Sequence, residues 1–428
     1  MNVQNPTMLT TEFEGQFGPA VPRSIAETGI DQQVLEALLL KNAMVSAQTS
    51  TEECSERMRL PITLVAELVE HLRVDSMIEI VGSSGPLGFR FTLSARGREH
   101  AQRAMQVSGY IGPAPVSLES YTAWVEHQAA NRPAVDPATI SESLRGMTLT
   151  EEARMLAGLA VTGNRSLFVY GPAGNGKTSI CLSLRQALTS SVWIPSCFAV
   201  EHQVVRVFDY QVHETIQTSP AASRAFDQRW IQIKPPLVVV GGELQLDDLD
   251  LAWSPSAKFY EAPVQLKSNG GILLIDDFGR QRMDAHELLN RWIVPMEYHI
   301  DYLKLQTGQK ICVPVRNLLM FATNLDPKQV TDPAFLRRMG YRLNLTSPSP
   351  EQYATIFRNY AARYGVTVDE GVLQKILNRY ESEKKERRCS EPRDLIERMR
   401  DLSRYRGADL EISDQTLDVA WKGFFGAD

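Results

Sequence analysis

Residues 166–188, SLFVYGPAGNGKTSICLSLRQAL, constrain the fold of this chain more than any other stretch. Residues 166–170 predict a short apolar strand, a glycine-rich loop follows, and a helical pattern begins at Lys177. Gly171 and Gly176 frame the pattern G-x-x-x-x-G-K-T, whose backbone N–H groups wrap around phosphate oxygens at φ angles that favour glycine. The sequence therefore predicts an α/β fold, with a parallel sheet flanked by helices, built around a phosphate-binding loop.

Individual residues of this loop have separate expected roles. Lys177 is expected to neutralise the β and γ phosphates, and the hydroxyl of Thr178 to ligate Mg²⁺. The N-terminus of the following helix adds a partial positive charge. We expect ATP and Mg²⁺ as ligands, with the nucleotide held by Gly171, Pro172, Ala173, Gly174, Asn175, Gly176, Lys177, Thr178 and Ser179.

A second stretch, GGILLIDDFGR at residues 270–280, ends an apolar run with two aspartates. Taken alone this is as consistent with an ordinary turn, because acidic residues often end strands by hydrogen-bonding their own backbone. A phosphate-binding loop elsewhere in the chain requires carboxylates at the tip of a nearby strand. We therefore predict that Asp276 holds the Mg²⁺ shell, through water, and that Asp277 is the general base.

With these two motifs, residues 139–425 resemble an AAA+ ATPase, and the resemblance assigns further residues. Asn324, which ends the strand pattern NLLMFATNLDP, matches the sensor 1 residue. Arg337 and Arg338, in DPAFLRRMGYRLNL, lie where the family has its arginine finger, and Arg338 is the better match. Arg393, in CSEPRDLIERMRDL, matches sensor 2, although an adjacent Arg-Asp pair is also a common surface feature.

The resemblance also implies an assembly. Because the finger acts on the nucleotide of a neighbouring subunit, it implies a ring, most often a hexamer in the family. The hairpin expected around Thr307 and Gly308 resembles that of the MoxR and sigma-54-activator members of the family. The sequence LLIDDFG, however, also resembles that of helicase loaders. Many relatives have Glu where this chain has Asp277, so a nucleotide-gated scaffold with little turnover stays an alternative.

The rest of the chain divides by its patterns. We expect a flexible arm over residues 1–28, a winged-helix-like domain over 29–108, a connector over 109–138, the nucleotide-binding domain over 139–347 and a helical lid over 348–428. SVWIPSCF, at residues 191–198, is expected to form the second strand of the nucleotide-binding domain. Phe259 and Tyr260 are interpreted either as an aromatic pore loop or as packing residues.

The winged-helix-like domain expected over residues 29–108 is the part of the chain that we expect to select the partner, either a protein or DNA. Its predicted reading helix offers Glu67 and Glu70 against a single Arg73, which disfavours contacts to DNA phosphates and base edges. Arg90, Arg96 and Arg98 near the expected wing keep DNA as an alternative. We therefore predict an ATP-hydrolysing, chaperone-like remodelling ATPase that acts on protein clients, and the alternative is a DNA-directed ATPase such as a helicase loader, transposition regulator or transcription activator.

Composition sets outer limits. The 428 residues are 43% hydrophobic and carry a net charge of −6, which disfavours a surface that binds polyanions as a whole. Five widely spaced cysteines and seven histidines show no metal-ligand spacing. Without an apolar run long enough for a membrane span or a signal sequence, we expect a cytoplasmic protein.

Overall fold

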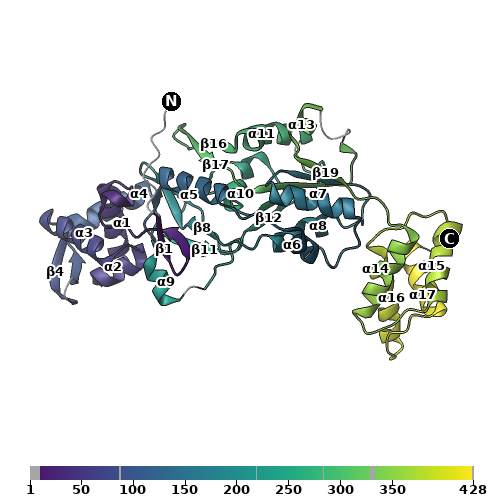
Figure 1. Cartoon of the computed structure of the whole chain (residues 1–428). Coiled ribbons are helices and arrows are strands. Elements are labelled where there is room, and N and C mark those ends of the chain that lie inside the picture. Colours follow the sequence, from purple (N-terminus) through teal and green to yellow (C-terminus); the bar gives the residue numbers. More distant parts are fainter. Residues whose placement is uncertain (1–9, 86–87, 218, 283, 328–332, 427–428) are drawn as a thin grey trace.

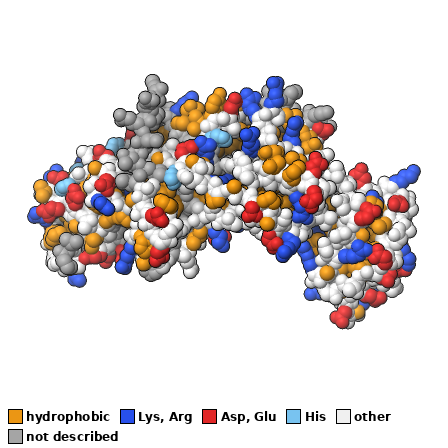
Figure 2. All heavy atoms as spheres, viewed as in Figure 1, with side chains coloured by type: hydrophobic (Ala, Val, Ile, Leu, Met, Phe, Trp, Pro, Cys, Tyr) orange, Lys and Arg blue, Asp and Glu red, His pale blue; other side chains and the backbone are white. Residues whose placement is uncertain are grey.

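The computed structural model describes residues 10–85, 88–217, 219–282, 284–327 and 333–426. Figure 1 shows an elongated molecule with a small helical unit at the N-terminal end, an α/β region in the middle and a separate bundle of helices at the C-terminal end. Figure 2 shows acidic and basic side chains interspersed over the face in view. Within the described ranges, no helix combines the length and the apolar character needed to cross a membrane.

The N-terminal unit consists of helices and a short three-stranded sheet. Its sheet has the order β3-β5-β4, and all its pairings are antiparallel. Ser50 caps one helix by accepting a hydrogen bond from Glu53 N, as capping residues do. The elements are α1 (Gln32–Ala43), β3 (Thr49–Ser50), α2 (Thr51–Met58), α3 (Ile62–Val74), β4 (Ile78–Ser83), β5 (Phe89–Leu93) and α4 (Ala95–Val107). Its description as winged-helix-like stays a prediction.

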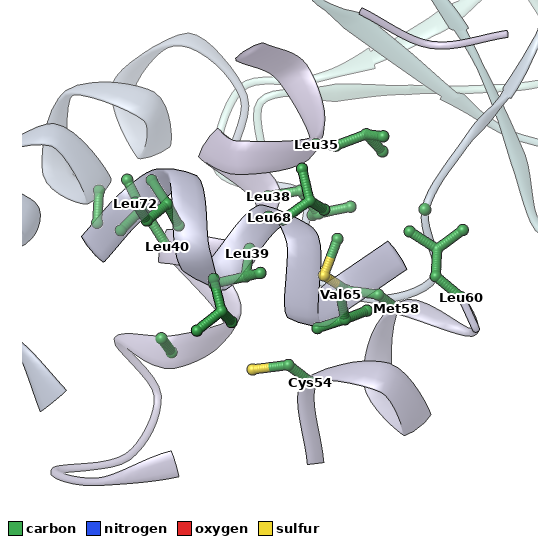
Figure 3. Close-up of a cluster of buried hydrophobic side chains, with 14 of the residues drawn as sticks. Leu35, Leu38, Leu39, Leu40, Cys54, Met58, Leu60, Val65, Leu68 and Leu72 are labelled. Atoms are coloured by element: carbon green, nitrogen blue, oxygen red, sulfur yellow. The ribbon is translucent and has the colours of Figure 1, made fainter. Parts of the chain in front are cut away.

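A core of leucines holds this unit together. Figure 3 shows side chains of α1, α2 and α3 converging, with Leu35, Leu39 and Leu68 fully buried. The apolar residues recur three and four positions apart on each helix, which places them on one face. Burial of one such leucine stabilises the fold by roughly 1.5–3 kcal/mol.

The expected flexible arm is wrong from Thr10 onward. The strands β1 (Thr10–Phe13) and β2 (Gln16–Pro19) form a hairpin, followed by the short helix η1 (Ala26–Thr28). The ring of Phe13 contacts that of Phe226, and Trp193 Nε1 donates a hydrogen bond to the carbonyl oxygen of Phe17 at 3.1 Å. These partners are some two hundred residues away in the sequence, so no local pattern indicated them.

A second sheet joins the expected connector to the segment between the two nucleotide motifs. Its order is β13-β14-β10-β9-β6. The members are β6 (Val116–Ser117), β9 (Cys197–Val200), β10 (Gln203–Arg206), β13 (Ala252–Ser254) and β14 (Phe259–Glu261). Helix α5 (Leu118–Ala130) follows β6 directly, and Tyr121 and Trp124 on it are buried. The connector is therefore a structural part of this region.

Two sequence expectations for this region are settled by the sheet. Residues 191–198 do not add a strand to the nucleotide-binding sheet, because β8 (Val192–Pro195) pairs with β11 (Trp230–Ile233) and Cys197 already belongs to β9. Tyr260 is buried against Trp253, with ring centroids 4.7 Å apart, and Phe259 contacts Tyr110. Both aromatic side chains therefore pack against neighbouring rings, which was the second of the two interpretations.

The central sheet is parallel throughout and has the order β12-β15-β18-β7-β19. Its strands are β7 (Leu167–Tyr170), β12 (Leu237–Val240), β15 (Ile272–Ile275), β18 (Leu318–Thr323) and β19 (Tyr341–Asn344). Three of them, β7, β15 and β18, are almost wholly buried, as is usual for apolar strands covered on both faces. The mixed α/β class predicted from the sequence is confirmed.

Further helices and a hairpin belong to the middle of the chain. They are α6 (Pro137–Ser143), α7 (Glu151–Thr162), α8 (Lys177–Leu184) with η2 (Arg185–Ala187), α9 (Pro220–Ala225), η3 (Leu246–Leu249), α10 (Val264–Lys267), α11 (Ala285–Tyr298) and α13 (Pro333–Arg338). The hairpin expected around Thr307 and Gly308 is present as β16 (Ile300–Lys304) and β17 (Lys310–Pro314), and Gly308 has φ 88° in the turn.

Four helices form the C-terminal bundle, which lies apart from the rest in Figure 1. They are α14 (Pro350–Ala362), α15 (Glu370–Ser382), α16 (Glu391–Tyr405) and α17 (Asp414–Phe425). Their buried faces share a core that includes Tyr353, Tyr380 and Trp421. The loop between α15 and α16 returns to the central region, as described below.

Candidate functional site

The candidate site lies at the carboxyl ends of the central strands. Because all five strands are parallel, the loops that leave β7, β15 and β18 emerge at one edge of the sheet. These loops carry the phosphate-binding motif, the Asp276-Asp277 pair and Asn324 respectively. Strand β18 lies between β7 and β15, so the acidic strand is near the loop strand without touching it.

The loop after β7 has the backbone conformation that its glycines permit. Gly171, Gly174 and Gly176 have φ angles of 136°, 81° and 84°, all in the range that side chains disfavour. A Cβ at Gly171 would lie 2.2 Å from the carbonyl oxygen of Leu345, so this position also lacks space. The loop then runs into α8 at Lys177, as the sequence predicted.

Lys177 is folded into the loop that it follows. Its Nζ donates hydrogen bonds to the carbonyl oxygens of Gly171 at 3.0 Å and Pro172 at 2.8 Å, and only 7% of the residue is exposed. Burial lowers the pKa of Lys177, while the carboxylates of Asp277 and Asp276 oppose that shift. The ammonium group therefore lies where the loop, the acidic pair and a phosphate could all reach it.

Thr178 and Asp276 meet across the sheet edge although 98 residues separate them. Thr178 Oγ1 donates to Asp276 Oδ1 at 3.0 Å and lies 2.9 Å from Oδ2. A hydroxyl and a carboxylate are the hard oxygen ligands that Mg²⁺ prefers. The donor set fits this metal, and within the described residues no cluster of three His, Cys, Asp or Glu side chains offers a different site.

Asp277 and Asn324 are also neighbours. Asn324 Nδ2 donates to Asp277 Oδ1 at 3.3 Å, and Asp277 itself has φ 47°, a left-handed conformation that costs roughly 1–2 kcal/mol outside glycine. The sequence had predicted both residues as members of the site, from separate motifs. The structure brings them together on the loops that follow β15 and β18.

Gln281 is a residue that the sequence reasoning missed. Its Oε1 accepts from Gly279 N at 2.8 Å, and its Nε2 donates to the carbonyl oxygen of Asp276 at 3.1 Å. Longer contacts of 3.4 Å join Nε2 to the carbonyl oxygens of Gly241 and Asp277. One amide thus braces the turn that presents the two carboxylates, and a glutamine in a loop carries no sequence signal for this role.

The loop between α15 and α16 also contacts the phosphate-binding loop. Ser390 N donates to the carbonyl oxygen of Gly174 at 2.9 Å, and Cys389 N donates to Asn175 Oδ1 at 3.3 Å. A Cβ at Gly174 would lie 2.7 Å from Ser390 Oγ and 3.4 Å from Arg388 Cδ. The bundle therefore reaches the loop through residues 388–390, which the sequence reasoning did not single out.

Helices α13 and α16 carry the three predicted arginines. Arg393, in the first turn of α16, is half-exposed and forms an ion pair with the adjacent Asp394 at 2.8 Å. This is the common surface pairing that the sequence left as the alternative to a sensor 2 role. Arg337 and Arg338 end α13. The turn after them is fixed at the amino end of β7, where Gly340 N donates to Ser166 Oγ at 3.0 Å. Arg338, ion-paired with Glu297 at 3.0 Å, is thus at the sheet edge opposite the phosphate-binding loop of its own chain.

A family model described as a domain of unknown function, DUF8689, matches residues 349–423, which cover the C-terminal bundle. No curated protein matches the sequence.

Solved structures resemble the chain at low identity. NtrX from Brucella abortus in complex with ADP has a TM-score of 0.39 and 15% identity, and the match covers 71% of this chain and 59% of that one. The RuvB Holliday junction branch migration motor of Thermotoga maritima has a TM-score of 0.39 and 15% identity, covering 69% of this chain and 75% of that one. Likenesses this weak support no statement about activity.

Proposed function

We propose that this chain is an AAA+ ATPase that binds MgATP at the edge of its central sheet and hydrolyses it to remodel protein clients. The observation that carries the proposal is the contact between Thr178 and Asp276, in which the threonine hydroxyl lies within 3.0 Å of both carboxylate oxygens. Two motifs far apart in the sequence supply oxygen ligands to one point, beside a loop of positive-φ glycines and a buried lysine.

Each residue of the site has a task that follows from its chemistry. Lys177 neutralises phosphate charge, and it does so by exchanging its two carbonyl partners for phosphate oxygens. Thr178 and Asp276 hold Mg²⁺, which supplies Lewis-acid neutralisation of the phosphates when bound. The backbone N–H groups of residues 171–177 complete the phosphate cradle.

Asp277 is the proposed general base. Its carboxylate takes a proton from the water that attacks the terminal phosphate, and Asn324 orients that carboxylate through the 3.3 Å hydrogen bond. An aspartate is one methylene shorter than the glutamate of many relatives, so it must act closer to the phosphate or through a second water. The scaffold alternative rests on this difference.

Arg338 is proposed to act on a neighbouring subunit. At the opposite sheet edge from its own loop, it is suited to complete the site of another copy in a ring, which the family forms most often as a hexamer. The ion pair with Glu297 holds the guanidinium near that edge. Arg337 is an auxiliary in this proposal, and Arg393 must leave Asp394 to serve as sensor 2.

The N-terminal unit is proposed to select a protein client. On α3, Glu67 is exposed and Arg73 is engaged by Glu70, with Arg73 Nε donating to Glu70 Oε2 at 2.9 Å. This helix therefore presents little positive charge for phosphates. DNA-stimulated ATPase activity that weakens with salt would favour the DNA-directed alternative instead.

The test is a comparison of ATP binding and phosphate release in wild type and Asp276→Asn. We expect the wild type to bind ATP in the presence of Mg²⁺ and to release phosphate, and the variant to lose release. A wild-type protein without affinity for ATP would overturn the proposal. Wild-type protein that binds ATP but releases no phosphate would favour the alternative of a nucleotide-gated scaffold.

A further inference from the structure

A cavity far from the nucleotide motifs lies between the N-terminal unit and the second sheet. It has a volume of about 330 Å³ and is bounded by α1, α4, the segment after α4, and β10. A single water molecule needs roughly 10–15 Å³ of such space, so the cavity has room for an organic molecule. Its walls include Val34 and Leu38 of α1, Val107 of α4, and Val204 of β10.

Lys41 lines this otherwise mostly apolar space. It lies three residues after Leu38 on the same face of α1, and only 5% of it is exposed. Its Nζ donates to the carbonyl oxygen of Ser108 at 3.0 Å. An ammonium group has three donors, and the other two need partners when the group is buried.

The charge of Lys41 has no acidic counterpart in the described part of the chain. It forms no ion pair there, and the described residues that line the cavity include neither Asp nor Glu. Burial lowers the pKa of Lys41 to about 8, and the nearby Cys197 opposes that shift. At neutral pH the group therefore still carries its charge, at a cost that a bound anion would offset.

We propose that this cavity binds a small organic carboxylate, whose apolar body contacts Val34, Leu38 and Val204 and whose carboxylate accepts from Lys41 Nζ. Among the described residues that line the cavity, Lys41 is the single lysine or arginine, and its charge matches one carboxylate; His202 is the lining's histidine. An apolar body matches the valine and leucine walls, which could not solvate a more highly charged ligand such as a phosphate. The proposal is independent of ATP, because the cavity shares no residue with the nucleotide site.

The experiment titrates octanoate and octanol into the full-length protein and follows saturable binding by calorimetry. The two probes have the same apolar chain and differ in charge. We expect the wild type to bind octanoate at one site at least about tenfold more tightly than octanol, a difference of roughly 1.4 kcal/mol. Equal affinities, or no saturable binding of octanoate at millimolar concentration, would overturn the proposal without any variant.

Lys41→Met then tests the contact itself. Methionine matches the four-atom apolar stem of lysine and lacks only the terminal ammonium group, so the charge is removed with little change to the cavity walls. We expect octanoate affinity to fall at least about tenfold while octanol affinity stays within about twofold. Lys375→Met, which removes an exposed lysine paired with Asp414 in the C-terminal bundle, is the matched control and is expected to behave as wild type. Octanoate affinity unchanged in Lys41→Met would contradict the assignment.

Discussion

Two buried lysines in this molecule have opposite surroundings. Lys177 has two carbonyl partners and two nearby carboxylates at the edge of the central sheet. Lys41 has one carbonyl partner and apolar walls in the N-terminal cavity. Burial lowers the pKa of both, but carboxylates oppose the shift at Lys177. The first arrangement is suited to catalysis on phosphates, and the second to holding a single organic anion.

The largest expected effect concerns the acidic side of the Lys177 site. Asp277→Asn keeps the size of the side chain and its contact with Asn324 but removes the base. We expect phosphate release to fall by roughly 10²–10⁴-fold, the usual contribution of general base catalysis, with ATP binding retained. Release measured by a phosphate sensor checks this. If release stays within a factor of two of wild type, Asp277 is not the base.

Lys177→Ala removes the cation that the acidic pair and the phosphates share. We expect affinity for ATP to fall by at least about 30-fold, the factor that corresponds to roughly 2 kcal/mol for a buried charge contact. Titration of a fluorescent ATP analogue measures it. Lys375→Ala, at an exposed ion pair, is the control, and equal affinity in both variants would remove the special role of Lys177.

Gln281 allows a finer test of the same region. In Gln281→Ala the turn at Asp276 and Asp277 loses its brace, and we expect kcat to fall about tenfold, roughly 1.4 kcal/mol, with nucleotide affinity unchanged. Gln281→Glu keeps the acceptor for Gly279 N but points a carboxylate at carbonyl oxygens, so it should be no better than alanine. A glutamate variant with wild-type kcat would show that the donated bonds are dispensable.

A prediction on stability, outside the catalytic region, concerns Lys41. At pH 7 we expect Lys41→Met to raise the free energy of unfolding by about 1–3 kcal/mol, because a buried charge without an acidic partner is removed. Between pH 8 and 10.5 the wild-type lysine is neutral when folded and protonated when unfolded. The free energy of unfolding of the wild type therefore rises with pH through this window relative to that of the variant. The difference in stability between the two proteins becomes smaller.

Urea unfolding at pH 7 and pH 10 measures that gap. Burial raises the pKa of the neighbouring Cys197 to about 12, and this thiol is present in both proteins, so its contribution largely cancels in the comparison. A gap that widens toward pH 10 would contradict the account of Lys41.

The two regions also differ in what the sequence predicted. The strand, loop and helix around Lys177 are contiguous in the sequence, and the glycine spacing indicates a phosphate-binding loop. The loop could therefore be predicted residue by residue. Asp276 followed because strand tips in a parallel sheet share an edge. The helical spacing of DQQVLEALLLKNAM, residues 31–44, likewise predicts a helix, and α1 forms there.

Pairing between strands that are far apart in the sequence could not be predicted from local patterns. Strand β6 has two residues, Val116 and Ser117, and joins a sheet whose other members begin eighty residues later. The hairpin at residues 10–19 is held by Trp193 and Phe226, which no local pattern could indicate. The cavity at Lys41 depends on such pairings, since β10 supplies part of its wall. A lysine within a helical pattern looks like an ordinary surface residue.

The most direct test of the central claim is the Mg²⁺ dependence of ATP binding. Binding of a fluorescent ATP analogue would be titrated with Mg²⁺ and with a chelator, in wild type, Thr178→Val and Asp276→Asn. If both side chains hold the metal on one triphosphate, wild-type affinity falls at least about tenfold, roughly 1.4 kcal/mol, when Mg²⁺ is removed, and both variants lose this dependence. Wild-type protein without affinity for the analogue, or variants that keep the full Mg²⁺ effect, would contradict the account.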